Sequence, residues 1–118
     1  MDKAFAQQFS SAWLDAWNSR DLDAIMSHFS DEIVFTSPVA TRIIEGSDGI
    51  LRGKEQLRAY WHEGLERNPE LHFEIEDFYL GVTTIVIHYR NHSGGLVNEV
   101  LIFDGPLVHE GHATYLVP

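Results

Sequence analysis

The chain has 118 residues, a length that fits a single domain with a buried core, which we place over residues 1–118. Eighteen acidic residues against eight lysines and arginines give a net charge of −10, which repels nucleic acid and anionic membrane surfaces. The chain has no cysteine, which excludes disulfides and thiolate chemistry, and no apolar run reaches the roughly 20 residues of a membrane span, so we expect a cytoplasmic protein without nucleic-acid or membrane partners.

Apolar side chains recur at helical spacing in two segments near the start of the chain. The first segment follows Asp2, an N-cap residue, and its apolar stripe consists of Phe5, Phe9, Ala12, Trp13, Ala16 and Trp17. After a polar break at residues 18–20, Asp21 caps a second segment, whose apolar positions are Leu22, Ile25, Met26 and Phe29. The spacing predicts two helices that meet at an angle.

The next stretch is the least regular part of the sequence. Residues 32–36 alternate briefly as in a strand, and Pro38 ends that strand because proline has no N–H to donate. Residues 39–53 contain three glycines, which favours a loop, with a short strand at residues 42–45. We therefore predict little regular structure before residue 54.

The second half of the chain predicts one helix and then four strands. The helix covers residues 54–67, ends before Pro69, and has one apolar face formed by Leu57, Tyr60, Trp61, Gly64 and Leu65. Turn residues rich in glycine separate the four expected strands, at residues 71–80, 83–91, 96–104 and 107–117. Helices followed by an antiparallel meander are typical of the α+β class.

The second and third of these strands flank a Ser-Gly-Gly turn and can be paired as a hairpin. A two-residue or four-residue loop within residues 92–95 places Arg90 opposite Val97 and His88 opposite Glu99. Burying a carboxylate and an imidazole on an otherwise apolar inner face costs free energy unless the two groups pair or take part in catalysis. We therefore predict that Glu99 and His88 form a catalytic acid–base pair; a three-residue loop would reverse the faces.

Two further side chains extend this predicted inner face. A turn over residues 104–107 pairs residue 103 with 108 and aligns His112 with Glu99 and His88, a row that is also able to bind a metal. Because His109 and His112 alternate faces, we expect no metal site. Arg90 is able to hold a ligand carboxylate or enolate, and its alternative is an ion pair with Glu74 or Glu76.

The same register leaves the opposite face of the sheet apolar. Its members are Ile85, Ile87, Tyr89, Val100 and Ile102. If the three helices cover the other face, this patch has no partner within the chain. We therefore predict a homodimer that forms through the outer face of the sheet.

Several motifs resemble the SnoaL-like branch of the nuclear-transport-factor-2-like superfamily. They are Trp13-x3-Trp17-Asn18-x2-Asp21-Leu22-Asp23-Ala24-Ile25-x3-Phe29-Ser30-Asp31-Glu32, Ser37-Pro38, Gly53-Lys54-x2-Leu57-x2-Tyr60-Trp61 and Glu99-x3-Phe103-Asp104-Gly105. The resemblance implies a cone-shaped roll, in which a strongly bent antiparallel sheet wraps around the first helix and a pocket lies at the open end. The superfamily includes ketosteroid isomerases, polyketide cyclases, dehydratases and binding modules, so the fold alone does not decide the function.

The ketosteroid isomerase pattern gives positions to compare. It has a tyrosine on the first helix, an aspartate base before the proline and a protonated acid on the third strand of the meander, which match Trp13, Ser37 and Glu99 here. Only the third position keeps an acid. Serine is not a base at neutral pH, and tryptophan donates only through its ring N–H, so the resemblance does not imply isomerisation by that triad.

We predict that Trp17 and Trp61 form the pocket wall and that Trp13 and Phe103 also bind the ligand, with Ser37 at the rim and residues 39–53 as a lid. The expected ligand is a small hydrophobic molecule with a carbonyl group, and the expected reaction is an isomerisation, cyclisation or dehydration without a cofactor. The structural alternatives are that the aromatic residues only fill the core and that Glu99 bonds to an indole or a backbone amide. In that case the chain is a non-catalytic ligand-binding or dimerisation module.

Overall fold

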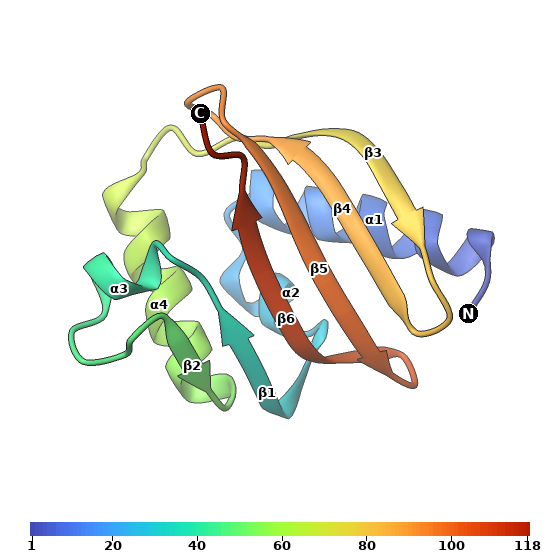
Figure 1. The fold of residues 1–118 in the computed structure, drawn as a ribbon, viewed down its shortest axis with the longest axis horizontal. Helices are drawn as coiled ribbons and strands as arrows, with labels where there is room; N and C mark the ends of the chain where they lie inside the picture. The colour runs from blue at the N-terminus through green and yellow to red at the C-terminus, as the bar shows by residue number, and fades with distance from the viewer.

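A long first helix crosses one face of a curved six-stranded sheet in the computed structural model, which describes residues 1–118 (Figure 1). The elements are α1 (Lys3–Asn18), α2 (Leu22–Met26), β1 (Phe29–Thr36), α3 (Ala40–Ile43), β2 (Ile50–Arg52), α4 (Lys54–Arg67), β3 (Glu74–Leu80), β4 (Thr84–Arg90), β5 (Leu96–Asp104) and β6 (Leu107–Tyr115). The strand order is β2-β1-β6-β5-β4-β3, and every neighbouring pair is antiparallel except β1 with β6, which is parallel. The predicted α+β class is confirmed. None of the helices combines the length and the apolar character needed to cross a membrane.

Both predicted N-caps are present. The Asp2 carboxylate accepts a hydrogen bond from the N–H of Phe5 at 2.9 Å, and Asp21 accepts one from Ala24 at 3.1 Å. The buried face of α1 consists of Ala6, Phe9, Ser10, Trp13, Ala16 and Trp17. Ala12, which we placed in the apolar stripe, is exposed. The helix therefore presents its aromatic side chains to the sheet.

The irregular segment before α4 contains more structure than the sequence predicted. A short helix, α3, replaces the strand expected at residues 42–45, and the strand of this segment is β2 instead. Gly49 and Gly53 adopt positive φ angles of 81° and 86°, which turn the chain into and out of β2. The turns let β2 pair antiparallel with β1, and α4 then begins at the predicted residue.

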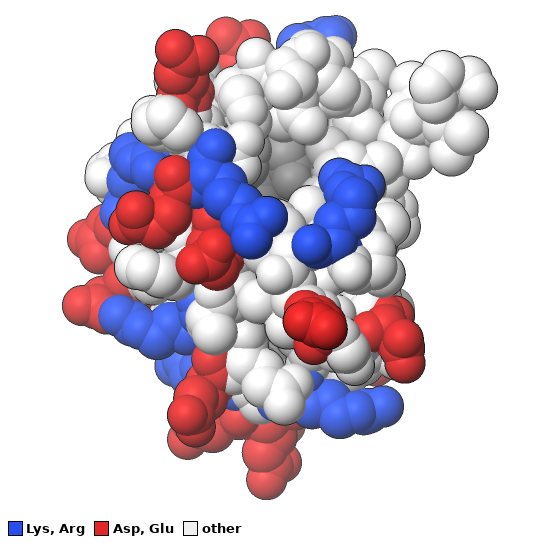
Figure 2. Space-filling model, turned by 90° about the vertical axis from the view of Figure 1, so that its left-hand side faces the viewer, with Lys and Arg blue, Asp and Glu red and all other residues white.

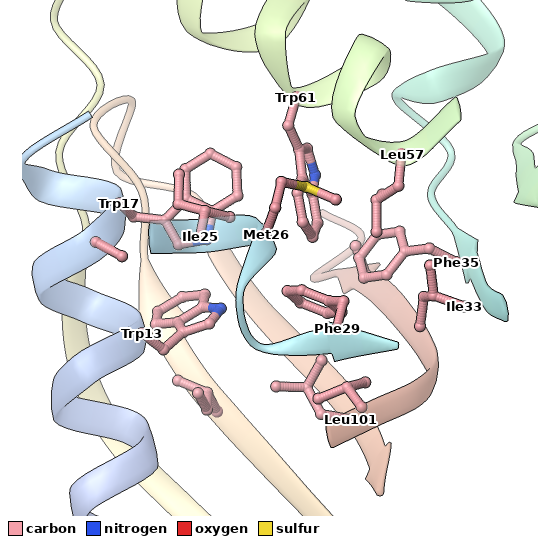
Figure 3. Close-up of a cluster of buried hydrophobic side chains, with 14 of the residues drawn as sticks. Trp13, Trp17, Ile25, Met26, Phe29, Ile33, Phe35, Leu57, Trp61 and Leu101 are labelled. Carbon is pink, nitrogen blue, oxygen red and sulfur yellow. The ribbon is translucent and has the colours of Figure 1, made fainter. Parts of the chain in front are cut away.

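The hydrophobic core lies between the helices and the inner face of the sheet. Figure 3 shows indole and phenyl rings from α1, β1 and α4 turned toward one another. Trp61 contacts Phe29 and Phe35 edge-on, with ring centroids 5.0 and 5.1 Å apart. Gly111 of β6 is required here, because a Cβ atom at this position would lie 2.7 Å from Phe35 Cδ2. The missing side chain lets β6 pack closely against the ring.

The register of the β4–β5 hairpin differs from the predicted one by one residue. His88 pairs with Asn98, and Ile87 pairs with Glu99. The loop has three residues, closed by a 2.9 Å hydrogen bond from Asn91 N–H to the Gly95 carbonyl, and Gly94 within it has φ of +84°. Side chains alternate along a strand, so this loop length reverses the predicted faces.

The reversal overturns the predicted dimer surface. Ile85, Ile87 and Tyr89 are buried against the helices, and only Val100 and Ile102 of the predicted patch lie on the outer face, where they are half-buried. These three apolar side chains are buried because they lie on the face of the sheet that the helices cover. That the chain forms a homodimer stays a prediction.

A bulge changes the register between β5 and β6. Phe103 pairs with Val108, as the turn predicted, but a bulge follows between Phe103 and Ile102. An extra residue on β6 therefore places Val100, and not Glu99, opposite His112. The predicted row of His88, Glu99 and His112 across three strands is wrong, because the two imidazoles lie on the face opposite the carboxyl.

Candidate functional site

An apolar cavity of about 390 Å³ opens between α3, α4 and the inner face of the sheet. Aromatic side chains from several elements form its wall, and the polar groups inside it are Tyr60, Tyr89, Glu99 and Tyr115. Its mouth carries exposed or half-exposed polar residues, namely Arg42, Arg67, Asn68, Asn91 and His92. A mainly apolar cavity with a few polar groups and a volume of roughly 300–1,000 Å³ is typical of small-molecule sites.

Glu99 is the only carboxyl group that lines the cavity. Its residue is 3% exposed, its side chain makes no hydrogen bond, and its Oε1 atom is fully enclosed without a partner. Burial raises the pKa of Glu99 to about 8, because ionisation is unfavourable in an apolar surrounding. The neutral acid therefore predominates at pH 7 and has an O–H to donate. The alternative in which an indole or backbone amide satisfies Glu99 is not what the structure shows.

Three phenols line the cavity together with this carboxyl group. Burial raises the pKa of Tyr60, Tyr89 and Tyr115, and the charge on Glu99 raises each of them further. The phenols thus stay protonated and serve as hydrogen-bond donors or acceptors. Tyr60 Oη lies 3.0 Å from Ser37 Oγ, which also accepts a hydrogen bond from the N–H of Val39 at 3.2 Å. Ser37 therefore positions Tyr60 and does not itself line the cavity.

The four aromatic residues that we predicted to bind the ligand divide into two pairs. Trp17 and Trp61 line the cavity, edge to face with ring centroids 5.1 Å apart. Trp13 and Phe103 are buried but do not line it. Trp13 stacks on Phe73 behind the wall, and Phe103 packs against two phenylalanines of α1, Phe5 and Phe9. The aromatic spacing thus identified core residues in all four cases and cavity residues in two.

The other predicted site residues lie on the outer face of the sheet. His88 Nδ1 is 2.7 Å from Asn98 Oδ1, and Arg90 donates to Glu76 at 3.1 Å and to the Gly94 carbonyl at 3.0 Å. The ion pair that we gave as the alternative for Arg90 is thus confirmed. The prediction that His88 and Glu99 form a pair is wrong, since the two side chains point to opposite faces.

His112 has partners of its own on that outer face. Its Nδ1 atom lies 2.6 Å from Thr36 Oγ1, and its Nε2 atom lies 2.7 Å from Glu110 Oε2. No group of three histidine or carboxylate side chains is arranged to hold a metal ion. His112 therefore ties β1 to β6 and does not reach the cavity.

Sequence reasoning missed several residues of the cavity. The predicted register places Tyr89 on the outer face, whereas the structure pairs it with the inward-facing Val97, and the aromatic pattern places Tyr60 in the core only. An odd loop length in the hairpin would have brought Tyr89 and Glu99 to one face. Arg42 and Arg67 carried no sequence signal, because α3 was not predicted and the end of α4 gave no sign of facing a cavity.

Comparison with known proteins places the chain in one family. The model of the SnoaL-like domain matches residues 11–110. A SnoaL-like protein of unknown function from Burkholderia thailandensis is 46% identical, with 98% of each chain covered and a TM-score of 0.92. No protein in the curated set matches the sequence.

More distant structures share the fold. AclR, a putative hydroxylase from Streptomyces galilaeus, is 19% identical with a TM-score of 0.77, covering 98% of this chain and 91% of its own. A putative polyketide cyclase from Sinorhizobium meliloti is 12% identical with a TM-score of 0.75, covering 91% of this chain and 94% of its own. The family match over most of the chain, together with a 46% identical relative of the same fold, shows that this protein belongs to the SnoaL-like family.

Proposed function

We propose that the protein binds a small apolar molecule with a carbonyl group and that Glu99 donates a hydrogen bond or a proton to the carbonyl oxygen. One observation carries the proposal: a buried carboxyl group without any protein partner lines the cavity. A buried polar group normally has a partner, because leaving it without one costs about 1–3 kcal/mol. A ligand oxygen would supply the partner that the protein does not.

The same contact supports catalysis by proton transfer. When the Glu99 proton is shared with the carbonyl oxygen, the enol form of the ligand is stabilised, and the α-proton passes to water at the cavity mouth. The enol is an intermediate common to isomerisation, cyclisation and dehydration of carbonyl compounds, and none of these steps needs a cofactor. Tyr60 and Tyr115, whose pKa values are raised by burial, are further donors for the developing oxyanion.

A second candidate is a ligand-binding module without catalysis. It is favoured by the absence of a base beside Glu99: Ser37 takes the position before Pro38, and His88 lies on the other face of the sheet. The relatives that share the fold include a putative polyketide cyclase, which agrees with a small-molecule role in either case. The prediction that the chain forms a homodimer is compatible with both candidates, because residues of a single chain line the cavity.

The test uses 2-tetralone labelled with ¹³C at its carbonyl, a bicyclic ketone with acidic α-protons. We expect the bound carbonyl signal to move downfield, as it does on accepting a strong hydrogen bond, and α-proton exchange in D₂O to be accelerated about 100-fold. Glu99→Gln should remove the acceleration and reduce the shift. Both effects should fall as the pH rises through about 8, where Glu99 ionises.

The matched control is Glu110→Gln, the same change on the outer face of the sheet. It should leave the carbonyl shift and the exchange rate unchanged. A shift that depends on Glu99 without faster exchange would favour the binding module. Failure of 2-tetralone to bind, or a shift that Glu99→Gln does not alter, would contradict both candidates.

A further inference from the structure

The mouth of the cavity has a charge opposite to that of the chain as a whole. Arg42 of α3 and Arg67 at the end of α4 line it, and no ionised carboxylate does. The chain has 18 acidic residues and eight lysines and arginines, so a site with two arginines departs from the overall negative charge of the chain. Figure 2 shows this face, with basic side chains on both sides of a hollow.

The two arginines differ in how far the protein neutralises them. Arg67 donates through Nε to Glu63 at 3.1 Å, an i,i+4 ion pair that leaves its terminal nitrogens without partners. The Arg42 side chain makes no hydrogen bond and has no carboxylate within 4.0 Å, and none of the four ion pairs of the chain includes it. The mouth therefore carries about one uncompensated positive charge.

Arg42 also acts on the interior of the cavity. Burial raises the pKa of Tyr115, and the charge of Arg42 opposes that rise; it does the same at Tyr60. The guanidinium therefore lies within electrostatic reach of the phenols near Glu99. A ligand that touches Arg42 at the mouth is in position to extend its body toward Glu99.

We propose that the ligand of this cavity is an apolar carboxylic acid, with its carboxylate held by Arg42 and Arg67 and its hydrophobic body against Trp17 and Trp61. A guanidinium fork matches a carboxylate in shape and charge, and one uncompensated charge suits a monoanion better than a dianionic phosphate. This inference rests on the proposed function, because it requires that a small molecule occupies the cavity. Together they define the substrate class as an apolar oxo acid, its carbonyl at Glu99 and its carboxylate at the mouth.

The test compares two isosteric probes by calorimetry at pH 7: naphthalene-2-carboxylate and its neutral amide, naphthalene-2-carboxamide. We expect the carboxylate to bind about tenfold more tightly, because a charge-assisted hydrogen bond is worth roughly 1–2 kcal/mol more than a neutral one. Arg42→Gln should remove that preference, because it weakens the binding of the charged carboxylate more than that of the neutral amide. Binding of the amide to the variant also reports that the variant is folded. Arg67→Gln should reduce the preference.

Arg58→Gln is the matched control, because Arg58 lies on the same helix as Arg67 and pairs with Asp23 outside the cavity. It should change neither affinity. Equal binding of the two probes, or a preference that survives Arg42→Gln, would overturn the carboxylate inference and leave the role of Glu99 standing. Conversely, a 2-tetralone carbonyl shift that ignores Glu99→Gln, combined with a charge preference that needs Arg42, would remove only the proposed role of Glu99. If neither probe binds, the inference is wrong.

Discussion

The two faces of the meander formed by β4, β5 and β6 both carry polar side chains, but those on the outer face have hydrogen-bond partners and the acid on the inner face has none. On the outer face, His88 bonds to Asn98, Arg90 to Glu76, and His112 to both Thr36 and Glu110. On the inner face, Glu99 follows Asn98 directly and has no partner. One step along β5 thus separates a satisfied network from an unsatisfied acid.

The comparison shows that residue type alone does not locate a site. An imidazole and a guanidinium are common in active sites, but here their hydrogen bonds are used within the protein, so they add stability to the sheet. The Glu99 carboxyl group keeps its hydrogen-bonding capacity for a ligand, at the expense of burial without a partner. An unpartnered carboxyl group that also lines a cavity therefore indicates the site more reliably than polar side chains that bond to one another.

The largest expected effect concerns the packing that supports the inner face. Trp13→Ala should lower the free energy of unfolding by about 3–5 kcal/mol, because the indole is 1% exposed and packs on Phe73 and Tyr89. Urea denaturation measures the change. Tyr79→Ala, which removes an aromatic side chain from a residue that is 57% exposed, should cost less than about 1 kcal/mol. Similar costs for the two variants would contradict the placement of the core.

The second effect is a pH dependence of stability that comes from Glu99. Its pKa is about 8 in the folded protein and 4.5 as the ordinary value, so between these values the folded state binds the additional proton. Stability from this group is therefore fully present below pH 4.5 and is lost as the pH rises through 8, by up to about 1.4 kcal/mol per pH unit. Glu99→Gln should remove this part of the slope in urea unfolding measured from pH 5 to 8.

Glu110→Gln provides the comparison on the outer face, where the carboxylate is half-exposed and bonded to His112. It should retain the slope that Glu99 contributes. If Glu99→Gln and the wild type lose stability in parallel as the pH rises, Glu99 is ionised in the folded protein and the contrast between the two faces fails.

The smallest effect is expected on the outer face itself. His88→Ala removes one side-chain hydrogen bond, to Asn98, and should lower the free energy of unfolding by about 0.5–1.5 kcal/mol. The exchange of 2-tetralone α-protons should stay at the wild-type rate, because His88 does not reach the cavity. A drop in that rate with unchanged stability would return His88 to the site.

Much of the local structure was predictable, because it depends on neighbouring residues. Asp2 and Asp21 cap their helices as predicted, α4 covers residues 54–67, and β5 covers residues 96–104. The family resemblance directed attention to Glu99, and the family match confirms that resemblance. These features follow from capping, periodicity and motif, all of which act within a few turns of chain.

The arrangement of the site depended on details that periodicity does not encode. The Ser-Gly-Gly segment is compatible with a loop of either an even or an odd number of residues, and the structure has three. The Asn91 side chain stabilises this loop by accepting hydrogen bonds from the N–H groups of Ser93 and Gly95. The bulge after Phe103 shifted β6 by a further residue. Each single-residue change exchanges the two faces of a strand.

The sequence by itself determined that the chain is an acidic α+β protein with an aromatic first helix and one acid at a family position on the third meander strand. Only the tertiary structure decided which side chains accompany that acid: phenols and indoles inside, two arginines at the mouth, and the histidines on the far side. The physical reason is that helix periodicity and caps are local, whereas the face of a strand depends on the parity of loops and bulges. Parity is set by closing hydrogen bonds and by packing against distant elements.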